Sequence, residues 1–208
     1  MKKLLCVMLA VLLVVSLSGC VDSFFAKNIM GTWSYRVQES QENVDMLLEN
    51  LDMYPEEIAL IETPLYTVKH LEFNEDMTYR YYYEVETEKT CVREFLTAAF
   101  ESIYAGRDTL AACYEMDMSA MTKDEFFQFY AQIYSQESFE ALIDTFVELA
   151  YDYESLSNTE SGTYTVSLNQ ITMDAPGEEY DGTVGYKLED DTLTLTYSDS
   201  TEVYTKVN

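Results

Sequence analysis

Two strand-rich segments flank a helical block, and this order limits the possible folds of the chain more than any other feature. Apolar and polar residues alternate along residues 32–38 and 78–86 before the block, and along 163–168, 183–188 and 192–197 after it. Such alternation is typical of strands that bury one face. We therefore predict an α+β fold in which an antiparallel sheet, either a β-barrel or an open meander, carries a helical insertion.

The strand predicted at residues 78–86 contains tyrosine at every second position. Tyr79, Tyr81 and Tyr83 therefore share one face of the strand. The turn sequence Asn74-Glu75-Asp76 joins this strand to another predicted at residues 66–73, so that the two form a hairpin. We expect the three tyrosines to point into the barrel.

The predicted insertion covers about residues 90–154, where apolar residues recur at helical spacing. The clearest stripes are Val92, Phe95, Leu96, Ala99 and Ile103, and then Phe139, Leu142, Ile143, Phe146, Val147 and Ala150. Thr122 and Glu125 form a capping-box pair at the start of a further helix. Ahead of the insertion, a shorter helix is predicted at residues 41–53, where Ser40 is placed to cap the first turn.

The amino-terminal sequence has the pattern of an export signal. Lys2 and Lys3 precede an apolar run over residues 4–15, which is shorter than the roughly 20 residues of a transmembrane helix. The next residues, Leu17-Ser18-Gly19-Cys20, resemble the lipobox of bacterial lipoproteins. This resemblance implies cleavage just before Cys20, lipid chains such as palmitate on that cysteine, and anchoring at the extracytoplasmic face of the cell membrane. An ordinary secretory signal is the alternative.

The charge of the chain limits its partners. It carries 38 acidic and 12 basic side chains in 208 residues, a formal net charge of −26 at pH 7. Nucleic acid is therefore not expected as a partner, because its phosphates would be repelled. The same repulsion keeps the protein body off an anionic bilayer, so the lipid must provide the attachment.

Two of the four cysteines remain for the folded domain, since Cys6 lies in the signal and Cys20 carries the lipid. Cys91 and Cys113 both fall in the helical block. Outside the cytoplasm they form a disulfide only if their helices meet at the right distance. Two buried free thiols are the alternative.

Four short segments, in this order, resemble those of the lipocalins and their calycin relatives, including small lipocalin-like domains of bacterial lipoproteins. They are Gly31-Thr32-Trp33 at the first strand, the hairpin at residues 71–79, Gly162-Thr163-Tyr164 after the helical block, and the late meander at residues 191–195. The resemblance implies a barrel in which Trp33 plugs one end beneath a basic side chain of the last strand, for which Lys206 is the candidate. It also implies an apolar ligand inside the barrel, although lipocalins lack a helical block of this kind.

On this reading the chain comprises a signal peptide at residues 1–19, a lipidated tether at 20–28 and a lipocalin-like domain at 29–208. The leading functional prediction is a non-catalytic lipoprotein that binds a small apolar or amphipathic ligand. The candidate ligand-binding residues are Trp33, Tyr79, Tyr81, Tyr83, Tyr164 and Tyr186, because large rings with polar tips suit such a pocket. The alternative is a structural or protein-interaction module of the cell envelope, with a filled barrel.

Catalytic, metal-binding and cofactor motifs are not expected. His70 is the only histidine, and no nucleophile or orienting carboxylate accompanies it in the sequence. Glu56-Glu57 and Glu178-Glu179 are predicted to be solvated loop charges rather than a glycosidase pair, because adjacent residues rarely converge on one substrate. We therefore predict no catalytic residue, no metal site and no cofactor.

Overall fold

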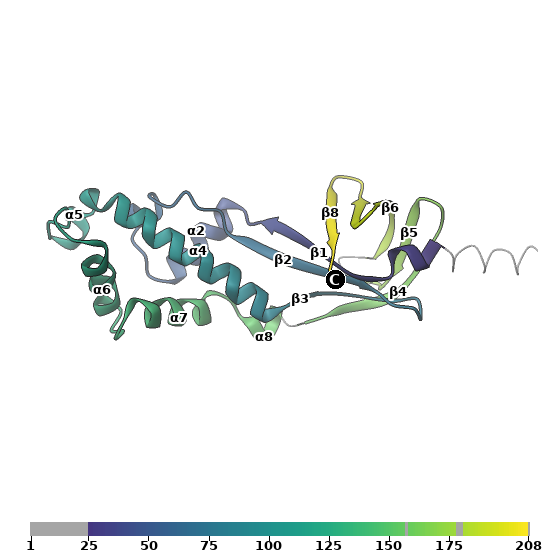
Figure 1. Cartoon of the computed structure of the whole chain (residues 1–208), viewed down its shortest axis with the longest axis horizontal. Coiled ribbons are helices and arrows are strands. Elements are labelled where there is room, and N and C mark those ends of the chain that lie inside the picture. Colours follow the sequence, from purple (N-terminus) through teal and green to yellow (C-terminus); the bar gives the residue numbers. More distant parts are fainter. Residues whose placement is uncertain (1–24, 157, 178–180, 208) are drawn as a thin grey trace, which may run out of the picture. The chain divides into compact units, whose positions relative to one another are not determined.

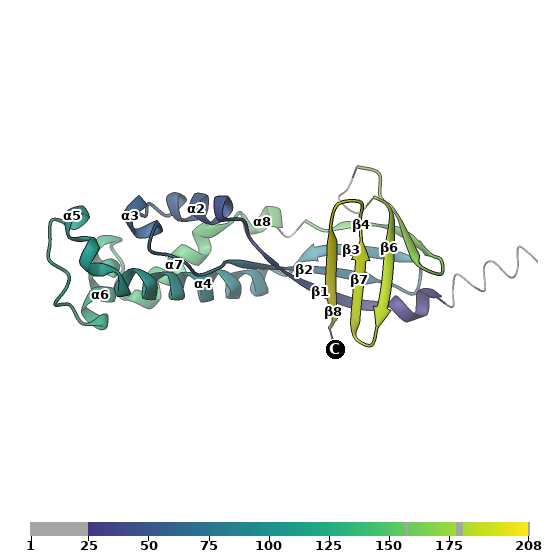
Figure 2. The ribbon, with the colours of Figure 1, turned by 90° about the horizontal axis from the view of Figure 1, so that it is seen from above.

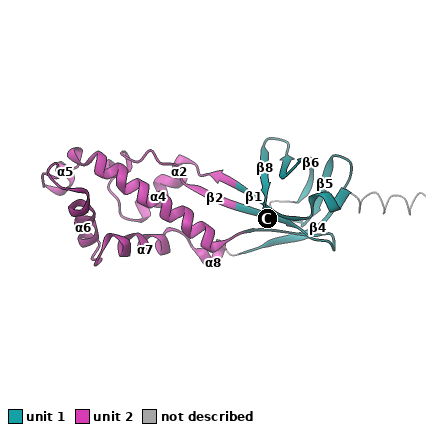
Figure 3. Cartoon of the chain, in the orientation of Figure 1, with its two compact units in different colours: residues 1–35, 69–82, 158–208 teal, residues 36–68, 83–157 magenta. Residues whose placement is uncertain are grey.

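The computed structural model describes residues 25–156, 158–177 and 181–207, and the chain divides into two compact units (Figures 1 and 3). Unit 1 comprises residues 1–35, 69–82 and 158–208, and unit 2 comprises residues 36–68 and 83–157. The sites predicted at residues 1–19 and Cys20 lie outside the described residues.

Eight antiparallel strands close into a barrel. They are β1 (Gly31–Gln38), β2 (Tyr66–Phe73), β3 (Thr78–Tyr83), β4 (Glu160–Val166), β5 (Gln170–Asp174), β6 (Gly182–Glu189), β7 (Thr192–Thr196) and β8 (Thr201–Lys206). Neighbours in sequence are neighbours in the sheet, as β6, β7 and β8 show in Figure 2, and β1 pairs with β8 to close it. Each of the eight described strands therefore has a hydrogen-bonded neighbour on both sides. The predicted α+β class, a lipocalin-like antiparallel barrel with a helical insertion, is confirmed.

The barrel core is built from the inward faces of these strands. The largest buried side chains there include Trp33, Phe73, Tyr79, Tyr164 and Tyr204, each at most 1% exposed. The rings of Phe73 and Tyr164 meet edge to face with centroids 4.8 Å apart, a favourable arrangement for aromatic pairs. Burial of one such apolar side chain contributes about 1.5–3 kcal/mol.

One glycine of the barrel is required by a close approach of three strands. Gly162 on β4 stands opposite Tyr79 on β3. A Cβ atom at residue 162 would lie 2.4 Å from the Asp174 carbonyl oxygen and 2.9 Å from the Tyr79 ring. Any larger residue at position 162 would therefore push β4 away from both β3 and β5.

The helices of unit 2 occur in two segments of the sequence, one after β1 and one after β3. They are α2 (Gln41–Asn50), α3 (Pro55–Ile58), α4 (Val85–Ala105), the 3₁₀ turn η1 (Arg107–Thr109), α5 (Ala111–Tyr114), α6 (Lys123–Ile133), α7 (Phe139–Ala150) and α8 (Tyr153–Leu156). The predicted caps are present, since Ser40 accepts from the Asn43 amide and Thr122 forms its capping box with Glu125.

The core of unit 2 is rich in aromatic rings. The predicted apolar stripes of α4 and α7 face it, and Phe100 on α4 packs edge to face on Tyr130 of α6 and on Phe139 of α7, each with centroids 5.2 Å apart. Phe146 adds a stacked contact at 6.1 Å. The helical packing therefore depends on large interlocking rings as well as on aliphatic side chains.

The strand predicted at residues 78–86 is too long, because β3 ends at Tyr83 and α4 begins at Val85. Glu88 and Val92 are buried at helical spacing, and acidic residues in the first turn favour a helix amino terminus. These effects outweigh the short apolar–polar alternation before residue 86. Tyr83 is consequently half-buried in unit 2 and does not share the interior position of Tyr79 and Tyr81.

Two further boundaries differ from the prediction. Leu168 was assigned to a strand, but it is 76% exposed in the turn before β5, a strand that the sequence pattern did not reveal. In β5 only Ile171 and Met173 are buried, and two alternating apolar residues are too few to predict a strand from the sequence. In the segment assigned to the tether, residues 25–29 are helical, and the side chains of Ala26 and Ile29 are fully buried.

Candidate functional site

Four of the six predicted ligand-binding residues pack into the barrel core. Trp33 and Tyr79 have no exposed surface, Tyr164 is 1% exposed and Tyr81 is 4% exposed. The four rings are therefore core side chains of the barrel, and none of them lines the pocket described below.

The other two predicted residues lie apart from this cluster. Tyr186 on β6 is half-buried opposite Leu195 of β7, and burial raises the pKa of its phenol. Tyr83 is half-buried in unit 2. The buried rings, Tyr186 and Tyr83 thus do not surround one common pocket.

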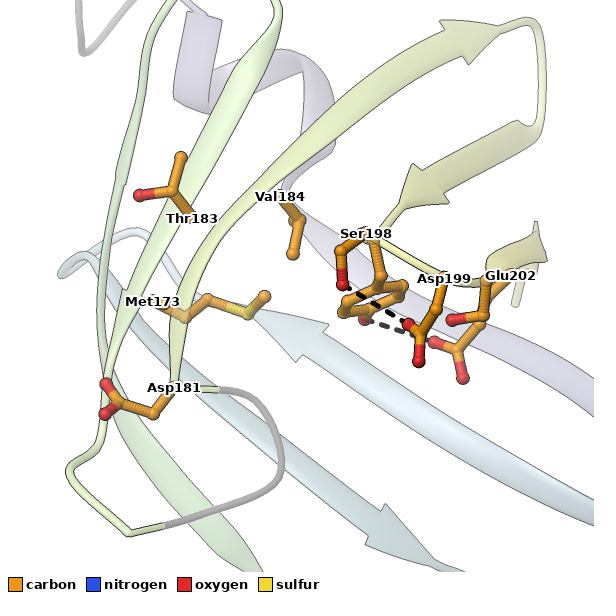
Figure 4. Close-up of a pocket in the computed structure, with 10 residues that line it drawn as sticks. Met173, Asp181, Thr183, Val184, Ser198, Asp199 and Glu202 are labelled. Carbon is orange, nitrogen blue, oxygen red and sulfur yellow. Dashed lines mark hydrogen bonds between the residues drawn. The ribbon is translucent and has the colours of Figure 1, made fainter.

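A pocket of about 350 Å³ opens at one end of the barrel, and we call it the mouth pocket (Figure 4). It lies where β5 ends, β6 begins and a turn joins β7 to β8. Its lining residues are Met173, Asp181, Gly182, Thr183, Val184, Tyr197, Ser198, Asp199, Ser200 and Glu202. In Figure 4, Met173 and Val184 lie between Asp181 on one side and Asp199 and Glu202 on the other.

The carboxylates of the mouth pocket are held by the surrounding strands. Glu202 Oε2 accepts hydrogen bonds from the hydroxyls of Tyr204 at 2.8 Å and Tyr197 at 3.2 Å, and Lys69 Nζ lies 3.8 Å from Oε1. Asp181 accepts from the Ala175 amide at 3.2 Å. Carboxylates and hydroxyls around a small apolar floor suit a cationic or hydroxylated ligand better than a wholly apolar one.

The remaining chemically active side chains occupy structural positions. His70 is 8% exposed and stacks on Tyr82, with ring centroids 5.2 Å apart. Cys91 and Cys113 are both free thiols, and burial raises the pKa of each, which lowers their reactivity. Among the described residues, no group of three or more His, Cys, Asp or Glu side chains is placed to bind a metal ion.

Glu57 was predicted to be a solvated loop charge, and this prediction is wrong. Its side chain is fully buried in unit 2, where it accepts hydrogen bonds from the hydroxyls of Tyr130 and of Tyr114, the latter at 2.5 Å, and from the Tyr54 amide at 2.8 Å. Burial raises the pKa of both phenols, so they remain donors at neutral pH. Pro55 followed by Glu57 is a helix-start pattern that the sequence already contained.

Glu88 is a second buried carboxyl group of unit 2. It is 1% exposed and accepts a hydrogen bond from the Val68 amide at 2.7 Å. Burial, with a smaller effect from Glu39, raises its pKa to about 7. This group therefore changes its charge near neutral pH, where an ordinary carboxylate would remain ionised.

Unit 2 carries most of the negative charge of the chain. Its sequence contains 24 acidic and 5 basic residues, a net charge of −19, whereas unit 1 contains 14 and 7, a net charge of −7. Ion pairs occupy three of the five basic side chains, namely Lys89 with Glu148, Arg93 with Asp144, and Lys123 with Glu101. The helical unit thus presents a large excess of carboxylates to its surroundings.

Comparison with known proteins adds no relative: no protein-family model, curated protein or solved structure matches the chain. Within the described residues, no helix has the length and apolar character needed to cross a bilayer.

Proposed function

We propose that the chain is a lipid-anchored, non-catalytic lipoprotein of the cell envelope, and that its acidic helical unit binds a cationic protein partner. The single observation that carries this proposal is the contrast between the two units. The barrel core is filled with aromatic side chains, while unit 2 has a net charge of −19. A filled barrel serves as a scaffold, and an acidic unit attracts positive charge over a distance.

The proposed anchor rests on the residues before the barrel. Leu17-Ser18-Gly19-Cys20 supplies the lipobox pattern, and attachment through Cys20 suits a body too acidic to lie on an anionic membrane. We propose further that the barrel is a distant lipocalin-like domain. Its support is the closed eight-stranded topology and the position of Lys206 over Trp33.

A second candidate function is the binding of a small ligand at the mouth pocket. Its volume of about 350 Å³ falls within the usual range of about 300–1,000 Å³ for small-molecule sites. The lining favours a ligand with a positive charge or several hydroxyl groups. Native mass spectrometry of the full chain, purified in detergent from its own host, tests this candidate through a reproducible small-molecule adduct.

Site-specific photo-cross-linking in living host cells tests the leading proposal. A photoreactive amino acid replaces one exposed apolar residue at a time. The positions in unit 2 are Met46, Met116 and Ile133, which are 57%, 41% and 43% exposed, and those in the barrel are Leu168 and Val203, which are 76% and 50% exposed. We expect a protein cross-link from at least one of the unit 2 positions and none from the barrel positions. Cross-links confined to the barrel, or no protein cross-link at any position, would contradict the proposal.

A further inference from the structure

A shallow groove of about 230 Å³ lies between α2 and the carboxyl end of α7 in unit 2. We call it the α2–α7 groove, and its lining residues are Glu39, Asn43, Met46, Leu47, Asn50, Ala150 and Tyr151. The volume falls below the range of about 300–1,000 Å³ that small-molecule sites usually occupy. The groove therefore has the size of an anchoring point for a side chain of a larger partner.

The groove combines exposed apolar surface with an ordered rim. Met46 is 57% exposed, although its neighbour Leu47 is buried, and Leu149 next to Ala150 is 66% exposed. Glu39 at the rim accepts hydrogen bonds from Asn43 at 2.8 Å and from Thr67 at 3.0 Å, so that this end of the groove is fixed. Methionine adapts its shape to different partners, which suits a docking position.

Both walls of the groove come from segments that contain no basic residue. Residues 37–68, which include α2, hold eight carboxylates and no Lys, Arg or His. Residues 124–157, which include α7, likewise hold eight carboxylates and no basic side chain. Lys89 and Arg93 of α4 pair with Glu148 and Asp144, two of the three carboxylates of α7, so the unpaired charge beside the groove lies mainly on the α2 side. An apolar groove between two such walls is complementary to a segment that is both apolar and basic.

We propose that the α2–α7 groove binds a basic amphipathic helix of an extracytoplasmic protein. One apolar side chain of that helix contacts Met46, and its lysines or arginines face Glu39 at the rim and the carboxylates Glu42 and Glu49, which neighbour Met46 at helical spacing on α2. This is the helix-in-groove mode of recognition. A second copy of the chain is a poor occupant, because it carries the same strong negative charge. This inference rests on the proposed function and narrows it to one surface.

Peptide binding to the full chain in detergent tests the groove. The probe is a fluorescent peptide of about 18 leucine and lysine residues, arranged so that the leucines form one helical face. A scrambled peptide of the same composition controls for charge alone. We expect the amphipathic peptide to bind at least about tenfold more tightly, measured by fluorescence anisotropy, and its binding to weaken at high salt.

Matched variants locate the binding. Met46→Gln keeps the size of the side chain but makes it polar, and we expect it to weaken binding of the amphipathic peptide about tenfold. Met116→Gln makes the same change at an exposed methionine outside the groove, and it is expected to leave binding unchanged. Because both methionines are exposed, circular dichroism should report the same fold for both variants. Equal affinities of the two variants, or equal binding of both peptides, would overturn the proposal.

A photoreactive residue at Met46, compared with one at Met116, separates the failure of this inference from the failure of the proposed function. Cross-links from Met116 alone, together with no peptide selectivity, would exclude the groove but leave unit 2 as the interaction surface. Cross-links from neither position, with no peptide selectivity, would exclude both proposals. A cross-link from position 46 would support the groove. If the double substitution Glu42→Gln and Glu49→Gln lowers the yield of that cross-link, the charged wall is supported as well.

Discussion

The ammonium group of Lys206 lies 5.2 Å from the centre of the Trp33 ring. The two residues are direct partners in the pairing of β1 with β8, which closes the barrel. Trp33 is fully buried, and its indole nitrogen donates to the Ile29 carbonyl oxygen at 2.7 Å. One aromatic side chain thus joins the first strand, the last strand and the helical turn before the barrel.

Removal of this ammonium group should weaken the closure of the barrel. Lys206→Met keeps the apolar stem but removes the cation–π contact, and we expect a loss of about 0.5–1 kcal/mol in unfolding free energy. Urea unfolding followed by fluorescence measures it directly, since Trp33 is the only tryptophan. Lys187→Met is the control, because the Lys187–Glu189 pair is exposed on the surface. An equal effect of the two changes would contradict the assignment.

Substitution of Gly162 tests the close approach of β3, β4 and β5. Gly162→Ala places a methyl group 2.4 Å from a backbone oxygen, and we expect a loss of about 1–3 kcal/mol. Gly185→Ala is the matched control, since its new methyl group would meet Thr196 at an ordinary 3.6 Å. Thermal unfolding of both variants should show a clear drop only for Gly162→Ala.

The burial of Glu88 leads us to predict that the free energy of unfolding depends on pH. Because burial raises its pKa in the fold from 4.5 to about 7, the protonated group favours the folded state. Its stabilising contribution is complete below about pH 4.5 and is lost as the pH rises to about 7, a change of up to about 3 kcal/mol. Glu88→Gln keeps an acceptor for the Val68 amide but does not ionise, so it should be more stable than the parent at pH 8.

The test compares denaturant unfolding of the parent and of Glu88→Gln at pH 5 and pH 8. Glu86→Gln, at an exposed position of the same helix, controls for the general effect of removing one negative charge. If the stability difference between parent and Glu88→Gln is the same at both pH values, Glu88 does not titrate in this range.

The buried carboxylate of Glu57 should depend on its phenol donors. Tyr130→Phe removes one donor and leaves a buried carboxyl oxygen of Glu57 with one partner fewer, so we expect a loss of about 1–3 kcal/mol. Tyr134→Phe is the comparison, because the Tyr134 hydroxyl makes a longer bond of 3.3 Å to the Asp52 carbonyl oxygen. Calorimetry should give the larger decrease in melting temperature for Tyr130→Phe.

The lipid anchor gives a prediction that is independent of the fold. Cys20→Ala should release the protein from the membrane fraction and abolish incorporation of labelled palmitate. Cys6→Ala changes a cysteine within the export signal and should leave both unchanged. Retention of Cys20→Ala in the membrane fraction, with label still incorporated, would exclude this residue as the lipid site.

The sequence predicts the outline of the fold well because side-chain periodicity is a local property. Strand alternation around Trp33 and Tyr164 and helical stripes around Phe95 and Phe146 each depend on a few neighbouring residues. The pattern is weaker where two periods overlap. Residues 84–86 fit both a strand and a helix, and the burial of Glu88 against the Val68 amide belongs to the helical reading.

The candidate sites were harder to predict, because they depend on contacts between residues far apart in the chain. Alternation placed Tyr79 and Tyr81 inside the barrel correctly, but it could not distinguish a lined cavity from a filled core. The mouth pocket joins residues near 173, 183 and 200. The environment of Glu57 is completed by Tyr130, 73 residues later, and no local pattern encodes such a partner.

The order of the strands has a consequence for how the chain folds. Tyr81 on β3 pairs with Glu160 on β4, and the 76 residues between the two strands carry the helices α4 to α8. Closing a flexible loop of that length costs about 4 kcal/mol in chain entropy. Helices form from local contacts and do so quickly. Early packing of α4 against α7 would shorten this loop, so the completion of the barrel depends kinetically on the segment inserted into it.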